Sequence, residues 1–172
     1  MPYPGPRALL DKYRLRAKRS WGQNFLGDEA ALDAIARLAV EREGEVVVEL
    51  GAGLGHLTAR LLLRGADVLA VERDRDMARV LRGELGDRVA VLEADAARLD
   101  YQELARRPAA GEAVPGAAPP RPVAVAGNLP YHLTSPILFS LLDQADAVSR
   151  AVLLVQREVA ERLAAAPGTR AW

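Results

Sequence analysis

The apolar residues of this chain fall into short runs that alternate with stretches of helical spacing. Five runs rich in Val, Leu and Ala predict buried strands, at residues 46–50, 67–72, 88–93, 123–126 and 151–155. Apolar positions at helical spacing predict helices at residues 28–40, 56–64, 76–85, 136–143 and 158–166. Strands that alternate with helices indicate a mainly parallel sheet with right-handed crossovers, which is a doubly wound α/β fold.

Capping residues and one irregular segment divide the chain further. Asp28 stands where a helix N-cap belongs, and Gly65 and Gly86 stand where C-terminal caps belong. Residues 105–122 contain five prolines and two glycines without periodicity. They predict a flexible loop, to which we assign no chemistry.

Length and composition fit one globular domain. The chain has 172 residues, half of them apolar, and no cysteine. With only two histidines, far apart in sequence, we expect neither a disulfide framework nor a bound metal. The sequence also shows no transmembrane run and no signal peptide, so the expected compartment is the cytoplasm.

The net charge of zero hides a basic N-terminus. Six of the residues from Arg7 to Arg19 are basic and one is acidic, so we divide the chain into a basic arm, residues 1–19, and a core, residues 20–172. Such an arm could bind RNA phosphates, or it could be a solvated, frayed terminus. The candidate RNA contacts are Arg14, Arg16, Lys18 and Arg19.

A glycine-rich loop follows the first predicted strand. Gly51, Gly53 and Gly55 let the backbone turn tightly and approach a ligand. Their GxGxG spacing differs from the dinucleotide GxGxxG, which favours a nucleoside with a small charged tail over a pyrophosphate. Taken alone, the loop could also be an ordinary strand-to-helix turn.

Acidic residues follow the next two strands. Glu72 stands where a doubly wound fold places an acid that accepts hydrogen bonds from both ribose hydroxyls. Asp95 could accept from an exocyclic amine, and the adjacent backbone at Ala96 could meet a ring nitrogen. Glu72 alone could be a solvent-facing residue of the run ERDRD, but together with the glycine loop these residues predict an adenosine site.

Polar and aromatic groups follow the fourth strand. Asn128 offers an acceptor oxygen, Leu129 a backbone carbonyl, Pro130 rigidity, and Tyr131 a ring on which a base can stack. Two acceptors could hold the amine of an unpaired or flipped adenine and aim its nitrogen at an electrophile, without a general base. The alternative is a proline turn in which Asn128 bonds its own backbone.

Five motifs in this order resemble those of the ribosomal RNA adenine N6-dimethyltransferases, which use S-adenosyl-L-methionine. They are RSWGQNFLGD, ELGAGLGHLT, AVERD, EADA and NLPYHLTSPILFSLL, and the resemblance covers residues 18–172. The NLPY and LVQREVAERL stretches are similar to the small-subunit (kasugamycin-sensitivity) type more than to the large-subunit (macrolide-resistance) type. The resemblance implies a Rossmann-like methyltransferase core.

The resemblance also implies roles for individual residues. Those that would address the target adenine are Asn128, Leu129, Pro130 and Tyr131. Those that would bind or shape the site of S-adenosyl-L-methionine are Gln23, Asn24, Leu26, Gly51, Gly53, Gly55, Glu72, Arg73, Asp95, Ala96 and Asn128. The implied partner is 16S ribosomal RNA in the immature small subunit, with no role for membrane or DNA, and the product is N6,N6-dimethyladenosine.

Members of this family continue through an antiparallel strand pair and a small helical domain that grips RNA, whereas this chain ends at Trp172. We therefore expect a core without these parts, with an uncovered sheet edge and apolar surface that lower stability or favour association.

Other functions remain open from the sequence alone. The chain could be a non-catalytic core that binds cofactor or RNA in ribosome assembly, or a dimethyltransferase of the large-subunit type. A dehydrogenase is disfavoured by the glycine spacing and by the lack of a hydride-site histidine or tyrosine-lysine pair.

Overall fold

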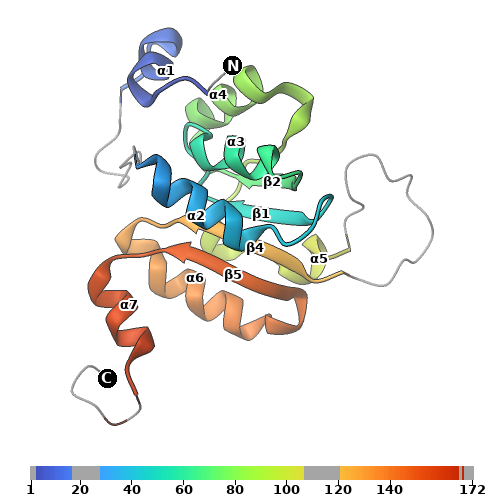
Figure 1. Ribbon diagram of the computed structural model, residues 1–172, viewed down its shortest axis with the longest axis vertical. Helices are drawn as coiled ribbons and strands as arrows, with labels where there is room; N and C mark the ends of the chain where they lie inside the picture. Colours follow the sequence, from blue (N-terminus) through green and yellow to red (C-terminus); the bar gives the residue numbers. More distant parts are fainter. Residues whose placement is uncertain (1–2, 17–27, 107–120, 167, 169–172) are drawn as a thin grey trace.

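The protein is built around a five-stranded sheet (Figure 1). The computed structural model describes residues 3–16, 28–106, 121–166 and 168. All strand pairs are parallel and the order is β3-β2-β1-β4-β5, which confirms the predicted fold class. The strands are β1 Val46–Leu50, β2 Asp67–Val71, β3 Ala90–Leu92, β4 Val123–Asn128 and β5 Val148–Leu154.

Helices cover both faces of the sheet. Successive strand residues point to opposite faces, so Val47 and Val48 enter different cores. The helices include α2 Glu29–Ala39, α3 His56–Leu63, α4 Arg75–Leu85 and α6 Tyr131–Asp143. The other helical segments are α1 Pro6–Tyr13, η2 Gly86–Arg88, η3 Ala96–Arg98, α5 Tyr101–Leu104, η4 Ala145–Ala147 and α7 Arg157–Ala164.

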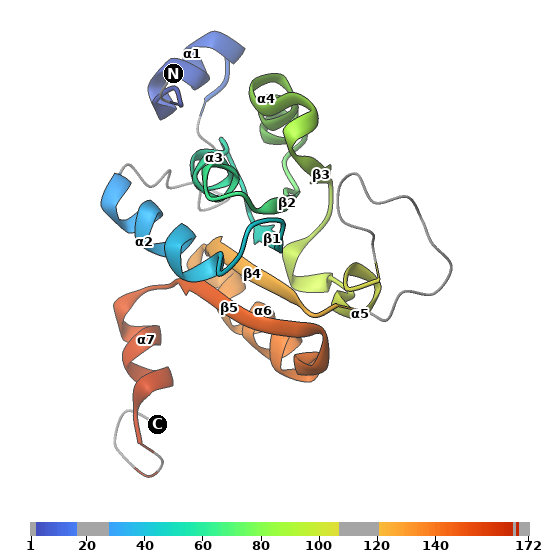
Figure 2. The same cartoon turned by 45° about the vertical axis from the view of Figure 1, so that its right-hand side comes forward.

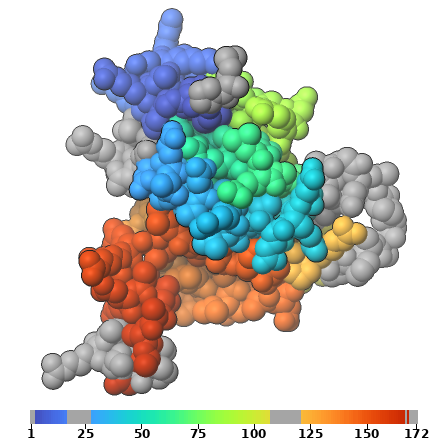
Figure 3. Space-filling model, viewed as in Figure 1, coloured from blue at the N-terminus to red at the C-terminus, as the bar shows by residue number. Residues whose placement is uncertain are grey.

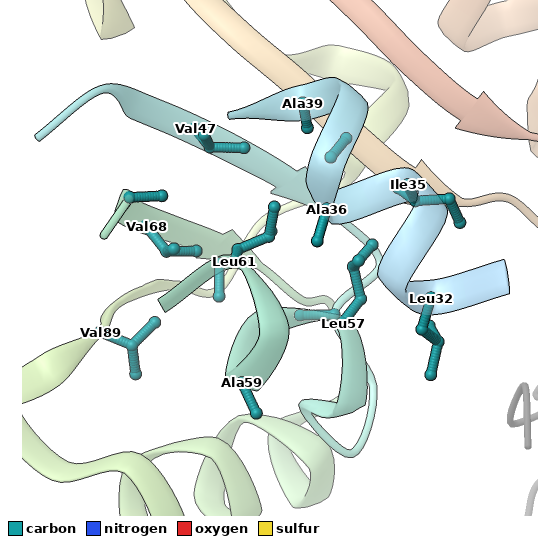
Figure 4. Close-up of a cluster of buried hydrophobic side chains, with 14 of the residues drawn as sticks. Leu32, Ile35, Ala36, Ala39, Val47, Leu57, Ala59, Leu61, Val68 and Val89 are labelled. Atoms are coloured by element: carbon teal, nitrogen blue, oxygen red, sulfur yellow. The ribbon is translucent and has the colours of Figure 1, made fainter. Parts of the chain in front are cut away.

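Each face has its own hydrophobic core. On one face, side chains of α2 and α3 pack on β1 and β2, as Leu57 and Leu61 do near Val47 and Val68 (Figure 4). On the other face, α5 and α6 pack against the alternate residues of β1, β2 and β4. Turning the view shows α6 on the opposite side of β4 and β5 from α2 (Figure 2). The strand ends are therefore held firmly between two layers.

The predicted helix caps are largely confirmed. The Asp28 carboxylate accepts from the backbone N–H of Ala31 at 3.1 Å, and Gly86 caps α4 with a positive φ of 57°. The C-cap of α3 is Arg64, and Gly65 follows it with a φ of 78°. These caps fix where each helix begins or ends relative to the sheet.

The start of α6 differs from the sequence prediction. The apolar spacing predicts a helix at residues 136–143. The helix instead begins at Tyr131, with Pro130 as its N-cap and Pro136 inside it. Pro130 already has a φ of −66°, and the buried side chains of Thr134 and Ile137 hold the first turns against the sheet. This difference places the end of β4 and the start of α6 in immediate succession.

The basic arm is not a frayed terminus where the structure describes it. Residues Pro6–Tyr13 form α1, and Leu9 of this helix is completely buried. Leu9 packs with Leu54, Met77 and Val80, so α1 lies against α4. Tertiary packing stabilises a helix that would be too short to persist alone.

Two other expectations concern the edges of the structure. Arg121 N donates to Ala105 O at 3.0 Å, which ties together the two ends of the predicted flexible loop; residues 107–120 lie outside the described part. β5 is an edge strand of the described sheet, and Phe139 and Leu142 of the neighbouring α6 are 67% and 71% exposed. Lower stability or association through this surface stays a prediction.

Within the described residues, no helix combines the length and apolar character needed to span a bilayer. Those residues also contain no group of three or more His, Cys, Asp or Glu side chains that could hold a metal ion.

Candidate functional site

A pocket lies at the carboxyl ends of the central strands. It contains about 1040 Å³ of space free of protein atoms, counted out to its open mouth. This is the edge of an open α/β sheet at which ligands bind. The pocket brings together predicted site residues from four separate stretches of the chain: Gly51, Gly53, Glu72, Arg73, Asp95, Ala96, Asn128, Leu129 and Pro130.

The glycine loop forms the floor of this pocket. Gly51, Gly53 and Gly55 all have positive φ, at 68°, 56° and 85°, a region that L side chains rarely adopt. The amides of Gly51 and Ala52 both donate to Val71 O, at 2.9 and 3.2 Å. The loop is thus folded back onto the end of β2, where Glu72 follows.

Glu72 connects the loop to the next turn. Its carboxylate accepts from Gly53 N at 2.8 Å and from Asp74 N at 2.7 Å. The Arg73 backbone also hydrogen-bonds to it, and since a carboxylate has about four lone-pair positions, room remains for a further donor. Burial raises the pKa of Glu72, and these hydrogen bonds oppose the rise by favouring the charged form.

Glu49 is a pocket residue to which the sequence analysis gave no role. It stands in β1, is 2% exposed, and its Oε2 has no hydrogen-bond partner among the described residues. Burial raises the pKa of Glu49 to about 8, and the negative charge of Glu72 adds to the rise. Thr58 lies close to Glu49 and opposes the rise of its pKa. The buried Thr58 hydroxyl nevertheless makes no hydrogen bond of ordinary geometry within the described chain. The pocket therefore contains two neighbouring buried carboxyl groups.

Asp95 and Ala96 form the wall beyond β3. Asp95 is half-buried and caps η3, with one carboxylate oxygen accepting from Ala97 N at 3.0 Å. Ala96 is buried, and Arg73 is exposed at the pocket's edge. The cap bond fixes the orientation of the Asp95 carboxylate, whose second oxygen is the one left for a ligand.

Asn128 ends β4, and β5 holds its backbone. It pairs in register with Leu154, and Leu129 N donates to Leu154 O at 3.1 Å. The Asn128 side chain makes no hydrogen bond within the described part of the chain. The alternative interpretation, a proline turn, requires a hydrogen bond between this side chain and its own backbone, and no such bond is present among the described residues. The side-chain amide of Asn128 therefore lies at the pocket with its N–H donors and its acceptor oxygen unpaired among the described residues.

Of the next two residues, Pro130 lines the pocket and Tyr131 does not. Pro130 O accepts from Leu133 N at 3.0 Å and from the Thr134 hydroxyl at 3.4 Å, which closes the first turn of α6. Tyr131 is 68% exposed and is not part of the pocket lining. Tyr131 could meet a base only from outside the pocket, so its stacking role stays a prediction.

Several predicted residues are not in the pocket. Gly55 shapes the loop but does not line the cavity, and Arg14 and Arg16 are exposed on the N-terminal segment. Gln23, Asn24, Leu26, Lys18 and Arg19 lie outside the described residues.

The structure also adds lining residues that the motifs did not indicate. These are mainly apolar groups from α2, α3 and α6, and two histidines: Leu32, Leu54, His56, Leu57, His132, Leu133 and Ile137. A charged residue inside the apolar run VVVEL was the signal for Glu49, whereas nothing local distinguishes these apolar residues from core.

Gly127 is required by a close approach of two strands. A Cβ at this position would lie 2.9 Å from Leu50 O and 3.2 Å from Leu129 Cδ2. We expect Gly127→Ala to lower the free energy of unfolding by about 1–3 kcal/mol, because the β1 backbone must move. Denaturant unfolding measures this, with Ser135→Ala on the exposed side of α6 as a control within about 0.5 kcal/mol. Equal stability of the two variants would contradict the crowding.

The fold and the pocket together define the structural class of the protein. A parallel sheet with a glycine loop after β1, an acid after β2 and a ligand pocket across their ends is a Rossmann-like core of the methyltransferase type. The family described as "Ribosomal RNA adenine dimethylase" matches residues 14–172. The chain belongs to this family.

Curated relatives agree with this assignment. The chain is 74% identical over 170 residues to "Ribosomal RNA small subunit methyltransferase A" of Anaeromyxobacter sp. (strain K), which covers 99% of the chain and 59% of that protein. It is 56% identical over 165 residues to the protein of the same name from Myxococcus xanthus (strain DK1622), and this match covers 96% of the chain and 54% of that protein. The chain thus spans little more than half the length of these relatives.

Solved structures of similar proteins share the fold. A dimethyladenosine transferase from Plasmodium falciparum superposes with a TM-score of 0.67 at 27% identity, covering 87% of this chain and 49% of that one. The 23S rRNA methyltransferase ErmE superposes with a TM-score of 0.63 at 29% identity, and the match covers 81% of this chain and 50% of that one.

Proposed function

We propose that the chain transfers methyl groups from S-adenosyl-L-methionine to N6 of adenosines in 16S ribosomal RNA and forms N6,N6-dimethyladenosine. One observation carries the proposal: the pocket brings the carboxylates of Glu72 and Asp95 together with the Asn128 amide, which has no hydrogen-bond partner among the described residues. The family and the names of the relatives support the reaction and the RNA.

The residues of the pocket fit this donor. Glu72 keeps lone-pair capacity that a ribose hydroxyl can use, and Asp95 keeps one oxygen for the amine of an adenine. The loop glycines place no side chain of their own at the pocket, and Glu49, whose Oε2 has no hydrogen-bond partner among the described residues, is part of its lining. When bound, S-adenosyl-L-methionine would supply a methyl group as the electrophile.

The acceptor side of the pocket would hold the target base. Asn128 Oδ1 and the Leu129 carbonyl can each accept one N–H of the adenine amine, and no described backbone group donates to that carbonyl. Holding both N–H groups aims the nitrogen lone pair at the methyl carbon. The nitrogen would receive the methyl group as the methyl–sulfur bond of the donor breaks, and the methylated amine would then release a proton to water. Positioning supplies most of the catalysis.

The proposed substrate places the enzyme in the cytoplasm, on immature small subunits. Arg14 and Arg16 are exposed and could contact RNA phosphates, together with Lys18 and Arg19 of the undescribed segment. In that case their replacement would weaken RNA binding evenly across sequences and reduce its salt dependence.

A second candidate function is the alternative that the sequence leaves open, a non-catalytic core that binds the donor in ribosome assembly without completing transfer. Similarity to ErmE at 29% identity keeps large-subunit RNA as an alternative substrate.

One assay separates these functions. The purified chain is incubated with methyl-labelled donor and with unmodified small or large subunits, and digested RNA is analysed by mass spectrometry. We expect N6,N6-dimethyladenosine in 16S RNA only. Donor binding without transfer selects the non-catalytic core, label in 23S RNA selects the large-subunit type, and absence of donor binding overturns the proposal.

A further inference from the structure

The N-terminal segment, residues 3–13, lies against the outside of the glycine loop. The Tyr3 hydroxyl donates to Leu54 O at 2.7 Å, across 51 residues of sequence. His56 Nε2 lies 3.0 Å from Pro4 O, and because a carbonyl only accepts, the histidine donates. The rings of Tyr3 and His56 meet edge to face, with centroids 5.3 Å apart. These contacts join Leu54 and His56 to the same short segment.

The same loop residues face the pocket on their other side. Leu54 and His56 line the cavity, whereas Tyr3 and Pro4 do not. Gly55 stands between them with a φ of 85°, and a Cβ there would lie 2.7 Å from the Tyr3 hydroxyl oxygen. The N-terminal segment therefore packs directly on the loop backbone and can influence the pocket only through the loop.

The far end of the segment is anchored on α4. Glu84 Oε1 accepts from Lys12 Nζ at 2.6 Å and from the Tyr13 hydroxyl at 2.7 Å. The Tyr13 hydroxyl occupies the space that a side chain at Gly83 would need. In Figure 3 the dark blue N-terminal segment lies over one end of the molecule, against the green helical layer. The segment is thus fastened at both ends, once to the loop and once to a rigid helix.

We propose that residues 3–13 form a clasp that holds the glycine loop in its donor-binding shape, and that Tyr3 is a positioning residue for the donor site. The match to the family begins at residue 14, after the clasp. The inference rests on the proposed function for the identity of the donor.

The physical reason lies in the flexibility of the loop. Three glycines within five residues give it many accessible conformations, and binding a ligand to one of them requires the others to be lost. A clasp that selects one conformation beforehand removes that cost from binding. Burial also lowers the pKa of His56, which favours the neutral ring in contact with Pro4.

The test uses Tyr3→Phe, which keeps the ring but removes the donor to Leu54 O. Binding of S-adenosylhomocysteine is measured by calorimetry, beside the melting temperature and amide hydrogen exchange of residues 53–56. We expect about three- to tenfold weaker binding and faster exchange in the loop, since one buried acceptor loses its partner. Tyr101→Phe is the matched control. The buried Tyr101 hydroxyl has no partner in the described chain, and Tyr101 does not line the pocket, so this variant should bind S-adenosylhomocysteine as tightly as the unsubstituted chain does.

The outcomes are distinct. Weaker binding and faster loop exchange in Tyr3→Phe alone support the clasp. A lower melting temperature with unchanged affinity gives Tyr3 a merely structural role and overturns the inference, while the proposed function stands. Equal losses of affinity in both tyrosine variants also overturn it, and a lack of binding by the unsubstituted chain overturns both proposals.

Discussion

Asn128→Ala is expected to abolish methyl transfer and leave donor affinity nearly unchanged. The substitution removes the only side-chain acceptor that β4 presents at the pocket, while Glu72 and Asp95 remain to hold the nucleoside. Loss of a group that orients the reacting atoms lowers the rate by roughly 10²-fold or more. Single-turnover transfer to 16S RNA and calorimetric binding of S-adenosylhomocysteine measure the two effects separately.

The control for this variant is Asn128→Asp, which has nearly the same shape and keeps two acceptor oxygens. It should retain more transfer than the alanine variant. If alanine reduces donor affinity and transfer by the same factor, Asn128 binds the donor and does not position the target amine.

Glu49→Gln is expected to flatten the dependence of stability on pH. The folded chain keeps the Glu49 proton up to a pKa of about 8, whereas the unfolded chain releases it near the ordinary value for glutamate. Between these values the folded state binds more protons, so the free energy of unfolding falls as pH rises, by up to about 1.4 kcal/mol per pH unit. Across pH 5–8 the loss should reach several kcal/mol.

Denaturant unfolding at a series of pH values measures this slope. Glutamine cannot ionise, so the variant should lose less stability than the parent as pH rises. Its remaining pH dependence combines Glu72, whose raised pKa acts in the same direction, with His56 and Glu84, whose lowered pKa values act in the opposite direction. Glu158→Gln, on the solvent-facing α7, gives the effect of removing one surface carboxylate. Identical slopes in the parent and in Glu49→Gln would show that the buried carboxyl group does not titrate in this range.

The central sheet and the main site could be predicted because their signals are local. The run VVVEL gives β1 its observed bounds, since a parallel strand covered on both faces is apolar almost throughout. Gly51, Glu72, Asp95 and Asn128 follow successive strands, and parallel strands place their carboxyl ends at one edge. Position in the chain therefore translates directly into position in the pocket.

Other features depend on tertiary contacts, which a local sequence pattern does not predict. The arm was open to two interpretations because α1 is short, and its stability comes from Leu9 against α4 and from Tyr3 against Leu54. The apolar spacing of residues 136–143 predicts only part of α6, because the first turn of this helix depends on the tertiary packing of Thr134. In both cases the fold decides what the sequence leaves undetermined.

The position of β4 has a consequence for how the protein is made. β4 lies between β1 and β5 in the sheet, yet roughly seventy residues separate Leu50 from Val123, which take several seconds to synthesise at roughly 5–20 residues per second. During that interval β1 has β2 beside it but no neighbour on its other edge, and the wall containing Asn128 does not exist. The nascent chain must therefore keep the open edge of β1 from pairing elsewhere until β4 emerges.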